Sequence, residues 1–377
     1  MGKAERVAAK QFKKLSDAQR RIVVYAEGRG DWAHVGPIVD ELLDQHGARI
    51  TYLTSEADDP ILERTHPALV ALAIGDGTER TLLFREMKAG LLLTTVPDLE
   101  TYQLKRSLYP VHYVYVFHAF VSTHMVYRPK AFDAFDTLLC VGPHHAEEIR
   151  ATEATYGLDK KRLVKHGYGR VDQLLSEAAQ RPAADPLDGR ATRVLVAGSW
   201  GDDALMENPQ GVEVLRCLVD AGHEVTARLH PMTVRHHAGL AERLAADVPG
   251  VIVETDMRSR ESLFRSDVMI SDWSGASFDY AFGLGKPVVY VDMPRKVNNP
   301  EYEQIGVEPI EVRLRAEIGG SVGLDELDTI AEATDRAARS VGQADRLAEL
   351  RDEWIYNVGS SASSAAGWIA AAAAKLG

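Results

Sequence analysis

The stretch "DVMISDWSGASFDYAFGLGKPVVYVD", residues 267–292, has the pattern of a strand, a helix and a second strand. Its first apolar run is typical of a buried strand, which ends at Ser271 and Asp272. The next segment has the period of a helix, and Gly283 and Gly285 are expected to stop it. The run "KPVVYVD" then predicts the next strand. Such a unit is typical of a parallel sheet covered by helices.

The same pattern recurs along both halves of the chain. Short runs such as "RRIVVYAE", "ARITYLT", "HYVYVFH" and "DTLLCVG" alternate with segments of helical period, and "TRVLVAGS" and "HEVTARLHP" restart the pattern in the second half. Residues 176–193, "SEAAQRPAADPLDGRATR", lack periodicity, which is typical of a linker. We predict an α/β protein with two Rossmann-like parallel-sheet domains, residues 1–185 and 186–340. Helices over 341–377 are expected to fold back towards the first domain.

The composition excludes several classes of protein. With 43 Lys and Arg against 55 Asp and Glu, the chain carries a net charge of −12, which argues against general nucleic-acid binding. Cys140 and Cys217 have no metal-ligand spacing and suggest no disulfide framework. No apolar run is long enough for a membrane helix or a signal peptide. We therefore expect a cytoplasmic protein.

The N-terminal stretch leaves two interpretations open. It predicts a basic amphipathic helix, which either caps the first domain, the favoured interpretation, or contacts the cytoplasmic face of the membrane. Its basic residues are Lys3, Arg6, Lys10, Lys13, Lys14, Arg20 and Arg21.

Polar residues that follow strands are the first candidates for a site, because ligands of parallel sheets gather at the carboxyl ends of the strands. Ser274 is a natural N-cap for the helix after Asp272, and Gly275 allows a ligand to approach the backbone. Such a helix start, with the hydroxyl of Ser277, suits a phosphate or diphosphate. Ordinary capping explains the same residues.

A second group of candidates carries positive charge or an imidazole. His230 follows a strand in "ARLHP" and could donate a hydrogen bond to a phosphate, with Arg228 beside it. Arg295 and Lys296 follow the strand of "KPVVYVD", where they suit a phosphate or a charged acceptor. A structural His and a solvated surface charge are the competing explanations.

The third candidate region closes a strand of the first domain. His118 ends "YVYVFH", and Ser122, His124 and Arg128 follow it as predicted contacts to an acceptor or a phosphate. If the domains face each other across a cleft, His118 lies opposite the helix start of the second domain. A general base on one wall and a phosphate grip on the other is what group transfer to a hydroxyl requires.

These residues together resemble the CDP-glycerol glycerophosphotransferase family, which builds teichoic-acid-type and capsular polyol phosphate polymers. The resemblance is strongest in "MISDWSGASFDYAFGLGKPVVYVDMPRKVNNPEY", residues 269–302. It extends to "RLHP", "KHGYGRVDQL" and "YNVGSSASSAAGWI" and begins near residue 112. The chain departs from the family with "FHAFVSTH" in place of W-H-G-T-P-x-K, and with Gly169 in place of a Pro.

The resemblance implies a fold, an activity and roles for individual residues. The fold would be GT-B-like, with CDP held by the second domain. His118 would be the base for the acceptor, while His230, Ser274 and Ser277 would grip the diphosphate. Asp272 would orient the turn or contact the nucleotide. The chain would move glycerol phosphate, or a related polyol phosphate, from a CDP-activated donor to a hydroxyl of a glycan or polyol phosphate acceptor, and it would release CMP. The reaction would serve the synthesis of a teichoic-acid-like, capsular or O-antigen polymer of the cell envelope.

Two alternatives and one cofactor question stay open. A GT-B glycosyltransferase or epimerase acting on a nucleotide sugar would need the same phosphate cradle, and a binding protein could keep the fold without the chemistry. No organic cofactor is indicated. Phosphate sites often recruit Mg²⁺, but no D-x-D pair ends a strand, so we expect metal independence.

Overall fold

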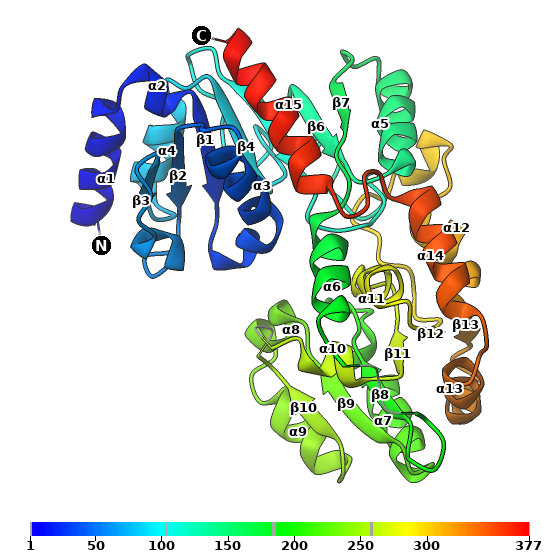
Figure 1. Ribbon diagram of the computed structural model, residues 1–377. Helices are drawn as coiled ribbons and strands as arrows, with labels where there is room; N and C mark the ends of the chain where they lie inside the picture. The colour runs from blue at the N-terminus through cyan, green and yellow to red at the C-terminus, as the bar shows by residue number, and fades with distance from the viewer. Residues whose placement is uncertain (1, 103, 183–185, 257–258, 377) are drawn as a thin grey trace.

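The computed structural model describes residues 2–102, 104–182, 186–256 and 259–376. Two parallel sheets form its framework, and helices cover both of them (Figure 1). The predicted α/β class with two parallel-sheet domains is therefore confirmed. The domain boundary predicted at residue 185 lies outside the described residues, so the exact limits stay a prediction.

The first sheet has seven strands in the order β3-β2-β1-β4-β5-β6-β7. Their bounds are β1 (Ile22–Ala26), β2 (Ile50–Thr54), β3 (Leu69–Ala73), β4 (Leu91–Thr94), β5 (His112–Val116), β6 (Thr137–Cys140) and β7 (Arg162–Lys165). In β1, Val23 and Tyr25 face one hydrophobic core while Val24 and Ala26 face another. Because both faces of the sheet are buried, its central strands carry apolar side chains on both faces.

The second sheet has six strands in the order β10-β9-β8-β11-β12-β13. Their bounds are β8 (Arg193–Val196), β9 (Glu224–Arg228), β10 (Ile252–Glu254), β11 (Val268–Ser271), β12 (Val288–Val291) and β13 (Gly319–Val322). In the pairing of β11 with β12, Met269 lies opposite Val288 and Ser271 opposite Tyr290. The strand–helix–strand unit of residues 267–292 thus supplies two neighbouring central strands.

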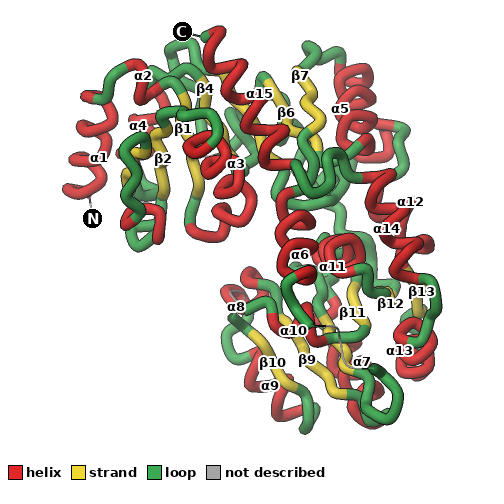
Figure 2. Tube along the Cα trace, in the orientation of Figure 1, coloured by secondary structure: helices red, strands yellow, loops and turns green. Residues whose placement is uncertain are grey.

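Helices connect the strands and cover the sheets (Figure 2). In the first half they are α1 (Gly2–Lys14), α2 (Asp17–Arg20), α3 (Trp32–Asp44), α4 (Thr78–Arg85), α5 (Pro143–Tyr156) and α6 (Gly169–Ala179). In the second half they are α7 (Pro209–Asp220), α8 (Pro231–His236), α9 (Leu240–Asp247), α10 (Glu261–Arg265), α11 (Ala276–Leu284), α12 (Ile310–Ile318), α13 (Ile330–Ala338), α14 (Gln343–Trp354) and α15 (Ser361–Lys375).

The N-terminal helix α1 caps the first domain. It buries Ala8 and Phe12 against the first sheet and packs on α4 and β3. Arg6 and Lys13 form ion pairs with Glu79 and Glu86. The apolar face of α1 is therefore used within the fold, as the favoured interpretation of the sequence expected. Among the described residues, none of the helices combines the length and the apolar character of a membrane-spanning segment.

The two C-terminal helices pack on different domains. Helix α14 contacts α11 of the second domain, whereas α15 lies against α3 of the first (Figure 1). Ala365 and Ile369 of α15 join the core of the first sheet. The start of α15 is held by Asp172 of α6, which accepts a hydrogen bond from the Ser361 amide at 3.0 Å.

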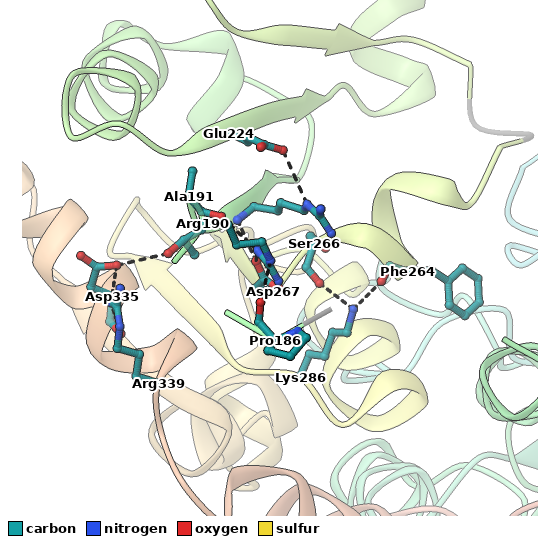
Figure 3. Close-up of polar contacts among 12 residues, drawn as sticks. Pro186, Arg190, Ala191, Glu224, Phe264, Ser266, Asp267, Lys286, Asp335 and Arg339 are labelled. Atoms are coloured by element: carbon teal, nitrogen blue, oxygen red, sulfur yellow. Dashed lines mark hydrogen bonds and ion pairs between the residues drawn. The ribbon is translucent and has the colours of Figure 1, made fainter. Parts of the chain in front are cut away.

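Polar contacts fix the chain at the amino edge of the second sheet (Figure 3). The guanidinium of Arg190 donates to both carboxylate oxygens of Asp267, at 2.7 and 2.8 Å. Lys286 donates to the carbonyl oxygens of Phe264 and Ser266 at 2.6 and 2.5 Å, and burial lowers its pKa to about 8. Asp267 and Lys286 thus anchor the two strands of the unit at the end opposite its helix start.

Candidate functional site

The helix start of the second domain lies at the carboxyl end of β11. Helix α11 begins at Ala276, one residue later than a Ser274 cap predicts, and the Ser274 hydroxyl accepts from the Ala276 amide at 3.3 Å. The helix continues through Gly283, where the sequence predicted a stop, and ends before Gly285, whose φ of +64° suits only glycine well. The amides of Ser277 and Phe278 donate within the turn, to Ser274 and Gly275. Among the described residues, the amides of Ser274 and Gly275 find no acceptor.

Two predicted ligand contacts are used inside the protein instead. The Ser277 hydroxyl is buried and donates to the Ser274 carbonyl at 2.8 Å, so it stabilises the turn. Asp272 is 1% exposed, and its carboxylate accepts from the Ser199 amide at 2.7 Å and the Leu205 amide at 3.0 Å. Of the two roles predicted for Asp272, the orienting one fits this geometry, since its carboxylate fixes the loop that follows β8.

His230 lies beside this loop, and only its Nδ1 has a hydrogen-bond partner among the residues that the structure describes. Its Nδ1 accepts from the Met232 amide at 3.1 Å and thereby caps α8. Burial, with the nearby Lys296 ammonium, lowers the pKa of His230 to about 4. The ring is therefore neutral at pH 7, and Nε2 carries the proton because Nδ1 is an acceptor. An Nε2–H of this kind can donate to a phosphate oxygen.

Lys296 adds a positive charge near His230 and the loop after β8. Its ammonium donates to the Trp200 carbonyl at 2.8 Å and lies 4.2 Å from the centre of the Trp200 ring. The His230 ring lies 6.0 Å from the same ring at an interplanar angle of 25°. Burial lowers the pKa of Lys296 to about 8, while Asp272 and Glu207 oppose the shift. We did not predict a role for Trp200, although it lies in the loop that follows β8.

The other predicted cations do not join this group. Arg228 is buried and pairs with Glu254 at 2.8 Å, and it donates to the Ser259 carbonyl at 2.8 Å. Its guanidinium therefore links β9 to β10 and the segment before α10. Arg295 lies over the Trp273 ring at 5.8 Å and reaches the Tyr302 hydroxyl at 3.4 Å.

His118 lies just beyond the carboxyl end of β5, near polar groups from the segments that follow β1 and β4. Its Nδ1 is 3.3 Å from the Tyr115 hydroxyl, and its ring lies 6.0 Å from that of His34. Burial lowers the pKa of His118, while the Asp31 carboxylate and the Thr95 carbonyl oppose the shift. Asp31 also accepts a hydrogen bond from the Thr95 hydroxyl at 2.8 Å.

Sequence reasoning missed Asp31, His34 and Thr95. Asp31 and His34 follow β1, and Thr95 follows β4, so they obey the same rule of strand ends that selected His118. They lie in the first part of the chain, where no resemblance directed attention to them.

The segment after His118 packs directly on the helix start of the second domain. A Cβ at Gly275 would lie 3.1 Å from Cγ1 of Val121 and 3.8 Å from Cβ of Ala119. The rings of Phe120 and Phe278 are 4.9 Å apart. The structure therefore brings the predicted base and the predicted anion grip to one junction between the domains.

Tyr168 adds a polar bridge at the same junction. Its hydroxyl lies 2.8 Å from Oδ1 of Asp279 on α11 and 3.4 Å from the His118 carbonyl. Arg170 pairs with the same carboxylate at 3.6 Å. The backbone of His118 is thus linked through Tyr168 to α11, the helix that begins at the predicted anion site.

Ser122 and His124 connect the domains and do not face His118. The Ser122 amide donates to Glu311 of α12 at 2.8 Å, and Nε2 of His124 lies 2.9 Å from the Val307 carbonyl. The Met125 carbonyl accepts from the amides of Asn298 and Asn299, at 2.9 and 3.2 Å. Residues 122–125 are therefore hydrogen-bonded into the second domain, Ser122 through its backbone amide and His124 through its ring.

Arg128 is exposed and follows residues 122–125, which form the seam between the two domains. It pairs with Asp98 at 3.3 Å and lies 5.3 Å from the Tyr102 ring. With His124 it lines a cavity of about 310 Å³ between α5 and residues 299–305. Within the described part of the chain, no group of three His, Cys, Asp or Glu side chains is arranged to hold a metal ion.

Several solved structures share this architecture. A variant of the wall teichoic acid polymerase TagF matches with a TM-score of 0.55 and 13% identity over 98% of this chain and 94% of that chain. A putative UDP-N-acetylglucosamine 2-epimerase from Listeria monocytogenes gives 0.58 and 14% over 91% and 93%. WaaG, a glycosyltransferase involved in lipopolysaccharide biosynthesis, gives 0.51 and 12% over 92% and 99%. The fold and the site thus define a GT-B-like protein with its polar groups at the junction of two domains.

Within this class, residues 121–297 match the family of the CDP-Glycerol:Poly(glycerophosphate) glycerophosphotransferase. The matched segment runs from the loop after β5 to the loop after β12. The predicted family and the prediction of a glycerophosphotransferase-like enzyme are confirmed. No curated protein matches the chain by sequence.

Proposed function

We propose that the chain transfers glycerol phosphate, or a related polyol phosphate, from a CDP-activated donor to a hydroxyl of a glycan or polyol phosphate acceptor. The observation that carries this proposal is the contact of the segment after His118 with Gly275. This contact brings the His118 imidazole, at the carboxyl edge of the first sheet, close to the start of α11 at the carboxyl edge of the second. We propose that this helix start binds the diphosphate. A cell-surface polymer of the teichoic-acid, capsular or O-antigen type is the product we expect.

In the second domain, three groups are suited to the diphosphate of the donor. They are the Nε2–H of His230, the Lys296 ammonium and the backbone amide of Gly275. Negative charge builds on the bridging oxygen as its bond to the distal phosphorus breaks and CMP leaves. Fixed donors aimed at that charge stabilise the transition state, because they need no reorganisation during the reaction.

On the opposite side, His118 accepts the proton of the attacking hydroxyl. The Tyr115 hydroxyl and the Thr95 carbonyl orient the ring. Because burial lowers the pKa of His118, its ring is unprotonated at pH 7 and ready to act as a base. The acceptor oxygen then bonds to phosphorus as the bond to CMP breaks.

Incubation of the purified protein with CDP-glycerol, CDP-ribitol and several UDP-sugars tests the reaction. We expect CMP release with a CDP-polyol, dependent on an acceptor. Release of UDP and never of CMP would instead favour a nucleotide-sugar enzyme of the same fold. Donor binding without turnover by the wild-type protein would favour a binding protein.

We also propose that the protein contacts the cytoplasmic face of the membrane at the amino edge of the first sheet. A hollow of about 530 Å³ there is lined by Arg20, Arg21 and Lys88, together with Tyr109 and the exposed Leu376. Basic groups beside exposed apolar side chains suit an anionic lipid surface. Sedimentation with vesicles that contain anionic lipid tests this; equal binding to neutral vesicles would contradict it.

A further inference from the structure

His34 is an aromatic neighbour of the proposed base and lies outside the family-matched segment. It lies in the first turn of α3, after β1, and its ring lies edge-on to that of His118 at 6.0 Å. On its other side the ring lies almost parallel to that of Tyr168, at 6.5 Å and 13°. Two imidazoles from different strand ends therefore face each other at the domain junction.

The backbone around His34 is held by both neighbouring segments. The Ala33 carbonyl accepts from Nε2 of Gln173 on α6 at 2.6 Å. Asp31, one turn earlier, accepts from the Glu27 amide and from the Thr95 hydroxyl, both at 2.8 Å. The position of His34 relative to His118 is thus set by contacts that involve neither ring.

The ring of His34 packs against aromatic neighbours, but its two nitrogens are not used within the described part of the fold. Within the described segments, no residue forms a hydrogen bond with either of its nitrogens, and the side chain is half-buried. Burial, with His118 and Arg170 nearby, lowers the pKa of His34 to about 3. A neutral imidazole offers one donor and one acceptor, which matches a hydroxyl better than it matches a phosphate.

We propose that His34 and His118 bind two neighbouring hydroxyls of the acceptor, so that the acceptor end is a vicinal diol. His118 takes the proton of the hydroxyl that reacts, and His34 forms a hydrogen bond with the hydroxyl that does not. Hydroxyls on adjacent carbons are about one hydrogen-bond length apart, which suits two facing rings. This inference rests on the proposed function and adds the acceptor class to it.

The experiment compares two acceptors with the wild-type protein and with His34→Gln. One acceptor is a glycerol phosphate oligomer with a terminal diol; the other lacks the terminal hydroxyl that does not react. We expect the wild type to prefer the diol by about tenfold in kcat/KM, since one buried hydrogen bond is at stake. In His34→Gln the diol should lose about tenfold, while the deoxy acceptor and the KM for CDP-glycerol change less than threefold.

Matched variants separate a ligand contact from a structural role. His46→Gln changes an exposed His just beyond the end of the same helix and should leave both acceptors unaffected. His34→Asn serves as the second variant if His34→Gln unfolds, and thermal melting with CDP binding reports the fold of each.

Two results would overturn the inference. If the wild type is active and both His34 variants keep its preference for the diol, the role of His34 is refuted. The proposed function is not affected by that result. A wild type that releases no CMP from CDP-glycerol with any acceptor would refute the proposed function, and the acceptor class with it.

Discussion

Val121 leaves almost no room for a side chain at Gly275. A Cβ there would lie 3.1 Å from Cγ1 of Val121, closer than nearly all such contacts in proteins. The first domain therefore reaches the backbone of the proposed diphosphate site, and the size of residue 275 sets the spacing between the two domains.

Replacing Gly275 with Val should lower kcat at least tenfold, because the segment that carries His118 must move away from the helix start. The Ala variant should show a smaller loss, since Val121 needs to shift by only a few tenths of an ångström. Steady-state kinetics with CDP-glycerol measure both. Gly320→Ala, at a position where a Cβ meets open space, is the control. Unchanged activity of Gly275→Val would contradict the packing argument.

Replacing His118 with Ala should reduce kcat by about 10²- to 10⁴-fold, the usual contribution of a general base. Burial lowers the pKa of His118, and only the unprotonated ring can accept a proton. Activity should therefore rise with pH through a limb below pH 6.5, the ordinary value for His, and level off at neutral pH. A pH–rate profile checks this, and a limb above pH 7 would contradict the assignment.

Lys296 should set the alkaline limit of activity. Its pKa is lowered to about 8 by burial, so its ammonium loses a proton, and with it the attraction for phosphate, as pH rises through that value. In Lys296→Arg the limb near pH 8 should disappear, because a guanidinium stays protonated. Lys296→Met should raise the KM for the donor at every pH, whereas Lys160→Met, at an exposed site, should not.

Glu311 should make the folded state less stable as pH rises. Burial, with Glu148 nearby, raises its pKa to about 7, above the ordinary 4.5. The folded state then binds more protons than the unfolded state between these values, so the free energy of unfolding falls as pH rises from about 4.5 to 7. The full difference is on the order of 3 kcal/mol.

The Gln variant tests that slope. Denaturant unfolding of Glu311→Gln at pH 5 and pH 8 should show less loss of stability at pH 8 than the wild type shows. Glu317→Gln changes an exposed carboxylate on the same helix, paired with Arg346 at 3.3 Å, and should keep the slope of the wild type. An equal free energy of unfolding of the wild type at both pH values would contradict the prediction.

Removal of divalent ions should leave the transfer rate unchanged within about twofold. The proposed grip on the diphosphate consists of an imidazole, an ammonium and backbone amides, which need no bridging cation. Dialysis against EDTA followed by rate measurement checks this expectation. Loss of activity that Mg²⁺ restores would show that the site requires a metal ion.

The alternation of strands and helices could be predicted because both sheets are buried on both faces. Runs such as residues 268–270 are apolar at every position, and glycine marks the end of α11. The strand-end rule then selected His118, His230 and the Gly275 turn, each of which lies just after a strand of one of the two sheets.

What could not be predicted depended on how particular side chains satisfy their hydrogen bonds. Ser277, Arg228 and His124 are of the right type for a phosphate site, yet each is paired within the protein. The sequence shows that a side chain can donate; only the fold shows which acceptor lies nearest. His34 was missed for the opposite reason, since its importance comes from a neighbour far along the chain.

Residues 122–125 leave the first sheet but are hydrogen-bonded to Glu311, Val307, Asn298 and Asn299 of the second domain. If the two sheets moved apart, residues 122–125 would move with the second domain. The chain would then bend in the short stretch between β5 and residue 122. His118 lies in that stretch and is held by Tyr115 of the first domain, so an opening would separate the proposed base from the nucleotide side. The protein would then align its base with the donor only when the two sheets are closed on each other.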